Sequence, residues 1–273
     1  MGATNGEGQA GMGTVPHWIE QGSGRRALVF LHGIGGSSRS FDWQLPAFAE
    51  RWRAIAWDMP GYGASALEGE MTWGLLARSL VGLLDHLELD AAVFVGHSMG
   101  GMVAQELAAS HPERVDGLVL SATSASFGSA DGEFQRRFLA ERLAPLDRGL
   151  APADFAAEVM PAMFKDHATP EAIARAIASM AAIPAATYRA ASHCLVSFNR
   201  REDLGTLACP TLVLAGEKDT IAPPKGMQRM AEQIADARYR VIDGVGHLAN
   251  LERPEAFNAA IAEFLDAAGL ATR

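Results

Sequence analysis

Short apolar runs alternate along the chain with longer segments in which apolar residues recur at helical spacing. The apolar runs are residues 27–31, 53–57, 93–95, 115–120 and 211–216. A continuous apolar run is typical of a strand that helices cover on both faces. Leucine recurs through 72–89 at the spacing of one helix face, with Thr72 available as the N-cap. Repeated strand–helix units predict an α/β fold with a doubly wound, mostly parallel sheet.

Weaker patterns complete this prediction at both ends of the chain. They favour an edge strand at 14–20, a strand at 238–242, and helices at 100–110, 225–234 and 254–268. Residues 1–13 are glycine-rich and polar, so we expect a flexible leader there.

The regular alternation breaks between residues 124 and 205. This stretch is rich in Ala, Met and Phe, and helical patches lie around 133–143, 153–164, 170–182 and 185–198. We therefore predict a single domain, in which 14–123 and 206–273 form the core and 124–205 is a helical cap insertion over the active site. Apolar residues of the cap are candidates for a pocket lining or for packing within the cap: Phe127, Phe134, Phe138, Met160, Met163, Phe164 and Met180. Its arginines Arg137, Arg175 and Arg189 are candidates for a substrate carboxylate or for a solvated helix face.

Charge and cysteine content narrow the class of protein. The 273 residues carry a formal net charge of −9, and no block of Lys or Arg interrupts the acidic surplus. We therefore expect neither nucleic acid nor an anionic membrane as a partner. Two cysteines, Cys194 and Cys209, are too few for a disulfide framework, and no apolar run reaches membrane-spanning length. A cytoplasmic enzyme acting on a small molecule fits these features, and the pattern indicates no particular oligomeric state.

The candidate chemistry begins at Ser98. The strand pattern at 93–95 runs into Gly96-His97-Ser98-Met99-Gly100, which fits G-x-S-x-G between a strand and a helix. Glycines on both sides of the serine allow a sharp turn that presents its hydroxyl as a nucleophile. A serine that merely caps a helix is the alternative.

Two further residues follow in the order that a Ser–Asp–His triad of this architecture requires. Asp219 lies just after the strand pattern at 211–216, and His247 lies in a glycine-rich loop after 238–242. We expect His247 to act as general base and Asp219 to orient its ring. Asp243 is a competitor for the acidic role, but its closeness in sequence to His247 favours a role in loop structure. Asp58 precedes the serine, and a turn with Pro60 and Gly61 accounts for it better.

Backbone amides complete the predicted catalytic site. The glycine-rich loop 32–38 follows a buried strand, where a parallel sheet places its ligand contacts. We expect the amides of Ile34 and Met99 to form the oxyanion hole, with a flexible turn as the alternative for the loop. A metal or organic cofactor is not required by this chemistry.

These motifs resemble those of the α/β-hydrolase fold family, from Ala27 to Ala268. The matching residues are His32-Gly33, Asp58 with Gly61-Tyr62-Gly63-Ala64-Ser65, Gly96 to Gly101, Gly216 to Asp219, and Gly246-His247. The resemblance implies a serine hydrolase of the carboxylic ester class (EC 3.1.1). The residue between Gly96-His97 and Met99-Gly100 is serine and not aspartate, which argues against the dehalogenase and epoxide-hydrolase branches.

Within that family, three segments are similar to 3-oxoadipate enol-lactonases: 188–210, 219–224 and 246–252. This similarity implies cleavage of a small ester or lactone in the catabolism of aromatic compounds, and general carboxylesterases remain an alternative. Carbon–carbon bond hydrolases of ring-cleavage products rank lower, because His97 and Gly35-Gly36-Ser37 stand where Asn and Gly-Pro-Gly are usual. Non-hydrolytic enzymes of the fold, and ligand-binding receptors that keep the triad, are further alternatives.

Overall fold

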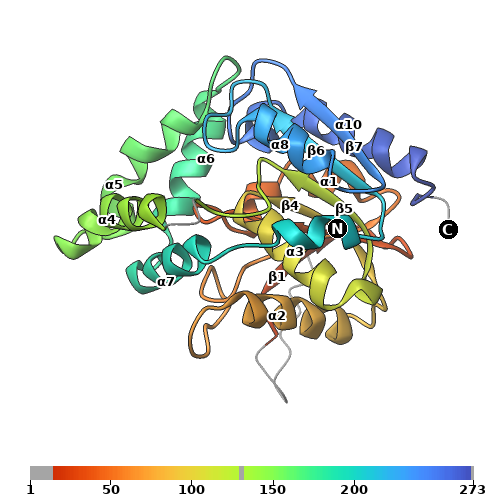
Figure 1. Cartoon of the computed structure of the whole chain (residues 1–273), viewed down its shortest axis with the longest axis horizontal. Helices are drawn as coiled ribbons and strands as arrows, with labels where there is room; N and C mark the ends of the chain where they lie inside the picture. The colour runs from red at the N-terminus through yellow and green to blue at the C-terminus, as the bar shows by residue number, and fades with distance from the viewer. Residues whose placement is uncertain (1–14, 129–131, 272–273) are drawn as a thin grey trace.

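A computed structural model describes residues 15–128 and 132–271, and the strands within them form one sheet (Figure 1). The strand order is β1-β3-β2-β4-β5-β6-β7, and only β1 pairs antiparallel to its neighbour, β3. The strands are β1 (Trp18–Gln21), β2 (Ala27–Leu31), β3 (Arg53–Trp57), β4 (Ala92–His97), β5 (Val115–Ser121), β6 (Thr211–Gly216) and β7 (Ala237–Ile242). The predicted doubly wound, mostly parallel sheet is confirmed.

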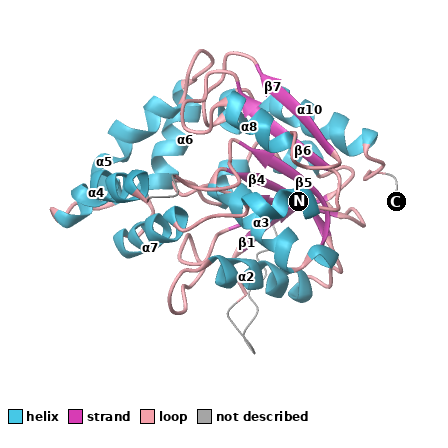
Figure 2. Cartoon of the chain, in the orientation of Figure 1, coloured by secondary structure: helices cyan, strands magenta, loops and turns pink. Residues whose placement is uncertain are grey.

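Successive residues of the central strands supply two separate hydrophobic cores. In β2, Val29 and Leu31 face one cluster, whereas Leu28 and Phe30 face the other. The first cluster packs against α2 (Trp73–His86), α3 (Met99–Ser110) and α8 (Pro224–Ala231). The second packs against α1 (Leu45–Phe48) and α10 (Pro254–Ala267). Figure 2 shows helices on either side of the sheet, and because both faces are covered, β2, β4 and β6 are buried along their whole length.

The segment between β5 and β6, residues 124–205, is here called the helical insertion. It contains α4 (Glu133–Asp147), α5 (Pro152–Val159), α6 (Pro170–Ala181) and α7 (Ala185–Val196), with a 3-10 turn at Met160–Met163 and another at Arg201–Thr206. Figure 1 shows these four helices gathered on one side of the sheet. The backbone segments at the two ends of the insertion pair with each other. Phe127 N donates to Phe198 O at 2.9 Å, and Arg200 N donates to Ala125 O at 2.7 Å.

The boundaries differ from the predicted ones where local pattern is weak. The edge strand β1 is shorter than the predicted 14–20, because Pro16 lacks an N–H for the ladder and the pairing with β3 begins at Trp18. The four-residue helices α1 and α9 (Ala249–Glu252) were not predicted, since one turn shows no periodicity. The predicted leader, residues 1–13, lies outside the described residues.

Candidate active site

Ser98 stands at the junction of β4 and α3 in a strained backbone conformation. Its φ of 53° and ψ of −119° lie in a region that non-glycine residues rarely adopt. Hydrogen bonds to the end of β5 and the residues after it hold this turn. Ser98 N donates to Ser121 O at 2.9 Å, and Thr123 Oγ1 donates to Ser98 O at 2.7 Å. Strain at one exposed hydroxyl, supported by its surroundings, is typical of a functional residue.

The flanking glycines are required by close backbone approach. A Cβ at Gly96 would lie 2.5 Å from Gly100 O and 2.5 Å from Gly101 Cα. A Cβ at Gly100 would overlap Leu31 O of β2. The first turn of α3 therefore lies against β4 and β2.

Hydrogen bonds join Ser98, His247 and Asp219 in a row. His247 Nε2 lies 3.0 Å from Ser98 Oγ, and His247 Nδ1 lies 2.8 Å from Asp219 Oδ2. Asp219 also accepts from the amides of Ile221 and Ala222 at 2.7 Å and 3.0 Å. Burial by itself would raise the pKa of Asp219, but the hydrogen bond from His247 and these amides hold the pKa below its ordinary value. An ionised Asp219 accepts the Nδ1 proton, which leaves the Nε2 lone pair directed at the Ser98 hydroxyl.

Three groups hold the backbone around His247. His97 Nε2 lies 2.8 Å from His247 O, and His247 N donates to Met163 O of the insertion at 2.9 Å. Glu252 Oε2 accepts from Gly246 N at 2.8 Å, while its other oxygen accepts from Lys165 N at 2.8 Å. Glu252 is only 4% exposed, so the carboxylate is committed to these amides. Sequence reasoning did not identify these supports, because most of the contacts join residues that are distant along the chain.

His97 is a buried neutral imidazole. Burial, and then the neighbouring His247, lower the pKa of His97 to about 3. Since the carbonyl of His247 can only accept, His97 Nε2 carries the proton and donates it. His97 therefore positions the loop of His247 without carrying charge at neutral pH.

The two competing aspartates have other partners. Asp58 Oδ1 accepts from Ser38 N at 2.7 Å, and Asp58 Oδ2 lies 2.7 Å from His17 Nδ1, so Asp58 braces neighbouring loops. Asp243 is exposed, and its backbone carbonyl accepts from Arg253. Of the three aspartates, Asp219 is the one that contacts His247.

The predicted oxyanion amide of Ile34 belongs to a loop, residues 32–38, whose carbonyls are held by hydrogen bonds. Met59 N donates to His32 Nε2 at 3.0 Å, so the opposite ring nitrogen of His32 donates to Gly33 O at 2.8 Å. Tyr62 Oη donates to Ile34 O at 3.0 Å. Among the described residues, no protein acceptor engages the amide of Ile34 or that of Met99, the first residue of α3. Both amides are thus available to a ligand.

A small cavity of about 40 Å³ adjoins Ser98 and His247. Its side chains are mostly apolar. Ile34 comes from the loop after β2, Met160, Met163 and Ala176 come from the insertion, and Leu248 and Leu251 come from the segment after His247. Ser40, His97 and Asn250 add polar groups, and none of the residues lining this cavity is a lysine or an arginine.

Of the seven apolar residues considered for a pocket lining or for packing within the cap, Met160 and Met163 line this cavity. The structure shows packing for the others. Phe127, Phe134 and Phe138 pack on one another, with ring centroids 4.8–6.4 Å apart, and Phe164 and Met180 are buried in the first core cluster. Packing among cap helices depends on contacts between turns, which a single helical pattern does not specify.

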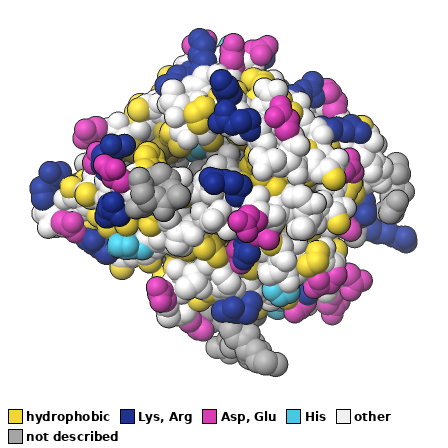
Figure 3. Space-filling model, in the orientation of Figure 1, with side chains coloured by type: hydrophobic (Ala, Val, Ile, Leu, Met, Phe, Trp, Pro, Cys, Tyr) yellow, Lys and Arg dark blue, Asp and Glu magenta, His cyan; other side chains and the backbone are white. Residues whose placement is uncertain are grey.

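The three arginines considered for a substrate carboxylate do not line this cavity. Arg175 pairs with Asp42 and Glu171, and Arg189 pairs with Asp147. Arg137 is exposed and lies over the ring of Phe134. Across the molecular face in Figure 3, side chains of both charges are interspersed with hydrophobic ones.

Both cysteines are free, Cys194 buried and Cys209 half-buried. Burial raises the pKa of the Cys194 thiol to about 12 and that of Cys209 to about 11. Over residues 15–128 and 132–271, no three His, Cys, Asp or Glu side chains cluster as a bound metal ion requires. Within the same ranges, no helix combines the length and apolar character needed to cross a membrane.

Comparison with known proteins gives consistent matches over most of the chain. Residues 26–254 match the alpha/beta hydrolase fold. The chain is 30% identical to 3-oxoadipate enol-lactonase 2 of Acinetobacter baylyi, covering 87% of both chains. It is 32% identical to a putative carbamate hydrolase, RutD, of a Caulobacter species, covering 89% of this chain and 91% of that one. Among solved structures, a thermophilic esterase from Thermogutta terrifontis with malate bound superposes with a TM-score of 0.82 at 30% identity, covering 92% of this chain and 93% of the esterase.

Proposed function

Because the chain belongs to the alpha/beta hydrolase fold family, we propose that it is a serine hydrolase that cleaves a small carboxylic ester or lactone through an acyl-enzyme. The observation that carries this proposal is the row of hydrogen bonds from Ser98 Oγ through His247 to Asp219. Similarity to a lactonase, an esterase and a putative carbamate hydrolase supports a hydrolase acting at an acyl carbon.

In the first half-reaction, Ser98 Oγ attacks the carbonyl carbon while His247 Nε2 takes the hydroxyl proton. The ionised Asp219 stabilises the resulting imidazolium through Nδ1. The tetrahedral intermediate collapses when the carbon–oxygen bond to the leaving group breaks, and His247 returns its proton to the departing oxygen. The product is an ester between the acyl group and Ser98, together with a free alcohol, or the opened ring of a lactone.

Water completes the cycle by the same steps. His247 removes a proton from water as its oxygen attacks the acyl carbon, and Ser98 leaves with that proton, which releases a carboxylic acid. In both tetrahedral intermediates the amides of Ile34 and Met99 donate to the oxyanion, a contribution of about 3 kcal/mol for each donor in comparable sites. Gly33 O and Ile34 N belong to one peptide plane, so the hydrogen bond from His32 to Gly33 O keeps the Ile34 donor oriented before the substrate arrives.

We assign residues 124–205 as a cap that covers this site. Met163 O accepts from His247 N, so the insertion is bonded to the loop that carries the general base, and Thr187 Oγ1 donates to Gly61 O of a second loop at 2.9 Å. Met160 and Met163 supply part of the small cavity, which suits a short apolar group beside the reacting carbon.

Hydrolysis of a panel of 4-nitrophenyl esters and enol-lactones tests the proposal, with Ser98→Ala as the critical variant. We expect Ser98→Ala to lower kcat by at least about 10³-fold, because the acyl-enzyme cannot form. Ser110→Ala, at the other end of α3, is the matched control and should retain wild-type turnover. Full activity in Ser98→Ala would overturn the assignment of the nucleophile. A folded wild type that turns over no member of the panel would instead favour a ligand-binding role.

A further inference from the structure

Asn250 on α9 is a buried carboxamide that lines the cavity beside Ser98. It is 1% exposed, and within residues 15–128 and 132–271 its Oδ1 atom is buried and takes part in no hydrogen bond. The other buried side-chain atoms in this state within those ranges are Gln44 Oε1, Trp57 Nε1, Gln105 Oε1 and Arg142 Nε. None of those four residues lines the cavity. A buried acceptor without a partner is unfavourable, so such a group is usually satisfied by a ligand or by water.

Neighbouring groups fix the orientation of this carboxamide. Asn250 Nδ2 donates to Ser40 O at 2.9 Å, and because a carbonyl oxygen can only accept, the atom turned away from Ser40 O is Oδ1. The main chain of the same residue is also held, since Gln44 Nε2 donates to Asn250 O at 3.1 Å. Asn250 Oδ1 is therefore an acceptor that is in place before a substrate arrives.

The size of the cavity limits what can donate to Asn250. Ser98, His247 and Asn250 line the same volume of about 40 Å³, which holds only a few atoms beside the reacting group. A hydroxyl needs little more room than a water molecule and fits such a volume. The oxygens of an ester or lactone group only accept hydrogen bonds, so within the proposed substrate class the donor is a further hydroxyl.

We propose that Asn250 Oδ1 accepts a hydrogen bond from a substrate hydroxyl that lies within a few atoms of the carbonyl attacked by Ser98. The substrate class is then a short hydroxy ester or hydroxy lactone, and Asn250 determines specificity for it. A site built around an acceptor discriminates against the analogue with a methyl group in place of the hydroxyl, because the acceptor is then left unpaired. This inference rests on the proposed function, because it names the substrate class of the same site.

Two matched pairs of esters test this assignment, each with a hydroxyl in one member and a methyl group in the other. Ethyl hydroxyacetate and ethyl propionate differ on the acyl side, whereas 2-hydroxyethyl acetate and propyl acetate differ on the alcohol side. Titration of the released acid measures kcat/KM. We expect the wild type to prefer the hydroxy ester in at least one pair, and Asn250→Leu to lower that preference about 10-fold or more. The pair that responds identifies the side of the substrate that Asn250 contacts.

Asn258→Leu is the matched control. Asn258 Oδ1 accepts from the same Gln44 Nε2 at 3.1 Å, but Asn258 does not line the cavity, so the wild-type preference should remain. Asn250→Ala removes the same acceptor with a smaller side chain and should lose the preference as Asn250→Leu does.

Three results would overturn the inference. One is a wild type that prefers the hydroxy ester in neither pair. Another is an unchanged preference in folded Asn250→Leu or Asn250→Ala. The third is an equal loss on both members of a pair, which would indicate a structural role.

A binding measurement separates this inference from the proposed function. The four esters are titrated into Ser98→Ala, with and without Asn250→Leu, and binding is followed by NMR of the ligand. A hydroxy ester that binds about fivefold or more tightly than its methyl counterpart, with the difference lost when Asn250→Leu is added, would support the site even if the wild type hydrolysed none of the esters. Equal binding within both pairs, or no binding, would overturn the site and leave the hydrolase proposal standing on its own test.

Discussion

Tyr62 shows how a single side chain outside the triad acts on the proposed chemistry. It is 1% exposed and donates its hydroxyl proton to Ile34 O. The carbonyl of Ile34 shares its peptide plane with the N–H of Gly35, so this hydrogen bond fixes the plane that follows the Ile34 amide in the loop expected to bind the oxyanion.

Replacing Tyr62 with Phe should therefore affect the chemical step more than substrate binding. We expect kcat to fall about 5- to 10-fold with KM changed less than twofold, since one neutral hydrogen bond is worth about 1 kcal/mol. Steady-state kinetics on one 4-nitrophenyl ester measure both constants. Tyr239→Phe removes a phenol that donates to Pro224 O, in a different part of the fold, and serves as the control. Equal kcat values in the two variants would contradict the positioning role of Tyr62.

At the scale of single residues, the sequence predicted those site residues that belong to local motifs. Ser98, Asp219 and His247 follow strands in a fixed order, and the structure brings their side chains together. Glu252 and His97 were missed as supports, because Glu252 contacts Lys165 and His97 contacts His247, and both partners are distant in sequence. No local pattern reports such contacts.

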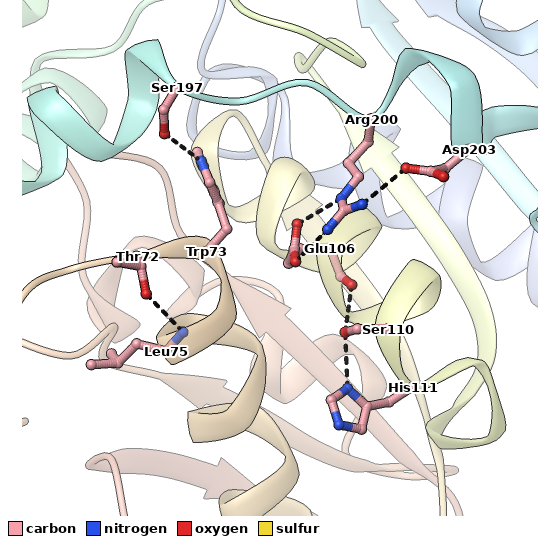
Figure 4. Close-up of polar contacts among 9 residues, drawn as sticks. All are labelled: Thr72, Trp73, Leu75, Glu106, Ser110, His111, Ser197, Arg200 and Asp203. Carbon is pink, nitrogen blue, oxygen red and sulfur yellow. Dashed lines mark hydrogen bonds and ion pairs between the residues drawn. The ribbon is translucent and has the colours of Figure 1, made fainter.

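At the scale of the elements, the segment in which the insertion returns to the core is bonded to α3, the helix that begins beside Ser98. Figure 4 shows Arg200 extending from the segment after α7 to Glu106 on α3, with Asp203 on its other side. Both Arg200–Glu106 hydrogen bonds are 2.7 Å long, and the Glu106 side chain is only 8% exposed. A second link joins Trp73 of α2 to Ser197 at 3.1 Å. The insertion and the nucleophile helix are thus joined by a charged pair.

Breaking this pair should destabilise the fold, because Glu106 would remain buried without its counter-ion. For Arg200→Met we expect a loss of about 2 kcal/mol in the free energy of unfolding, less than for a fully buried pair because the Arg200 side chain is 33% exposed. Urea unfolding provides the measurement. Arg189→Met breaks the exposed pair with Asp147 and should cost less than about 0.5 kcal/mol. A loss no larger in Arg200→Met than in that control would show that the ion pair contributes little.

The predictability of the elements follows from how each one is stabilised. Strands buried on both faces have unbroken apolar sequences, and β2, β3 and β6 begin and end at the predicted residues. The helices of the insertion were predicted to exist, but their mutual packing was not, so the sequence left open whether Phe127, Phe134 and Phe138 line a pocket or pack on one another. Helical spacing defines an apolar face without identifying what that face contacts.

At the scale of the whole molecule, the buried imidazoles of His32 and His97 make the free energy of unfolding depend on pH. Burial lowers the pKa of His32 and, together with the neighbouring His247, lowers that of His97 to about 3. In the unfolded chain both rings bind a proton near pH 6.5, whereas in the folded chain they stay neutral. Below pH 6.5 the unfolded state therefore binds more protons, so stability is lost as the pH falls towards the folded pKa values.

We expect His97 to remove about 2 kcal/mol of unfolding free energy between pH 7 and pH 5, and His32 to lower the unfolding free energy in the same direction. Urea unfolding at the two pH values measures the loss, and His97→Gln should reduce it by about 2 kcal/mol. Glutamine retains an N–H that can reach His247 O, so the pH dependence and not the absolute stability is the quantity compared. An identical acid loss in His97→Gln and the wild type would contradict the assignment.

The central claim is that Ser98 is an activated nucleophile, and mass spectrometry after incubation with a fluorophosphonate tests it most directly. The account predicts one adduct on the wild type, located on the peptide that contains Ser98, and none on folded Ser98→Ala. An adduct of equal yield on Ser98→Ala, or no adduct on the folded wild type, would contradict it.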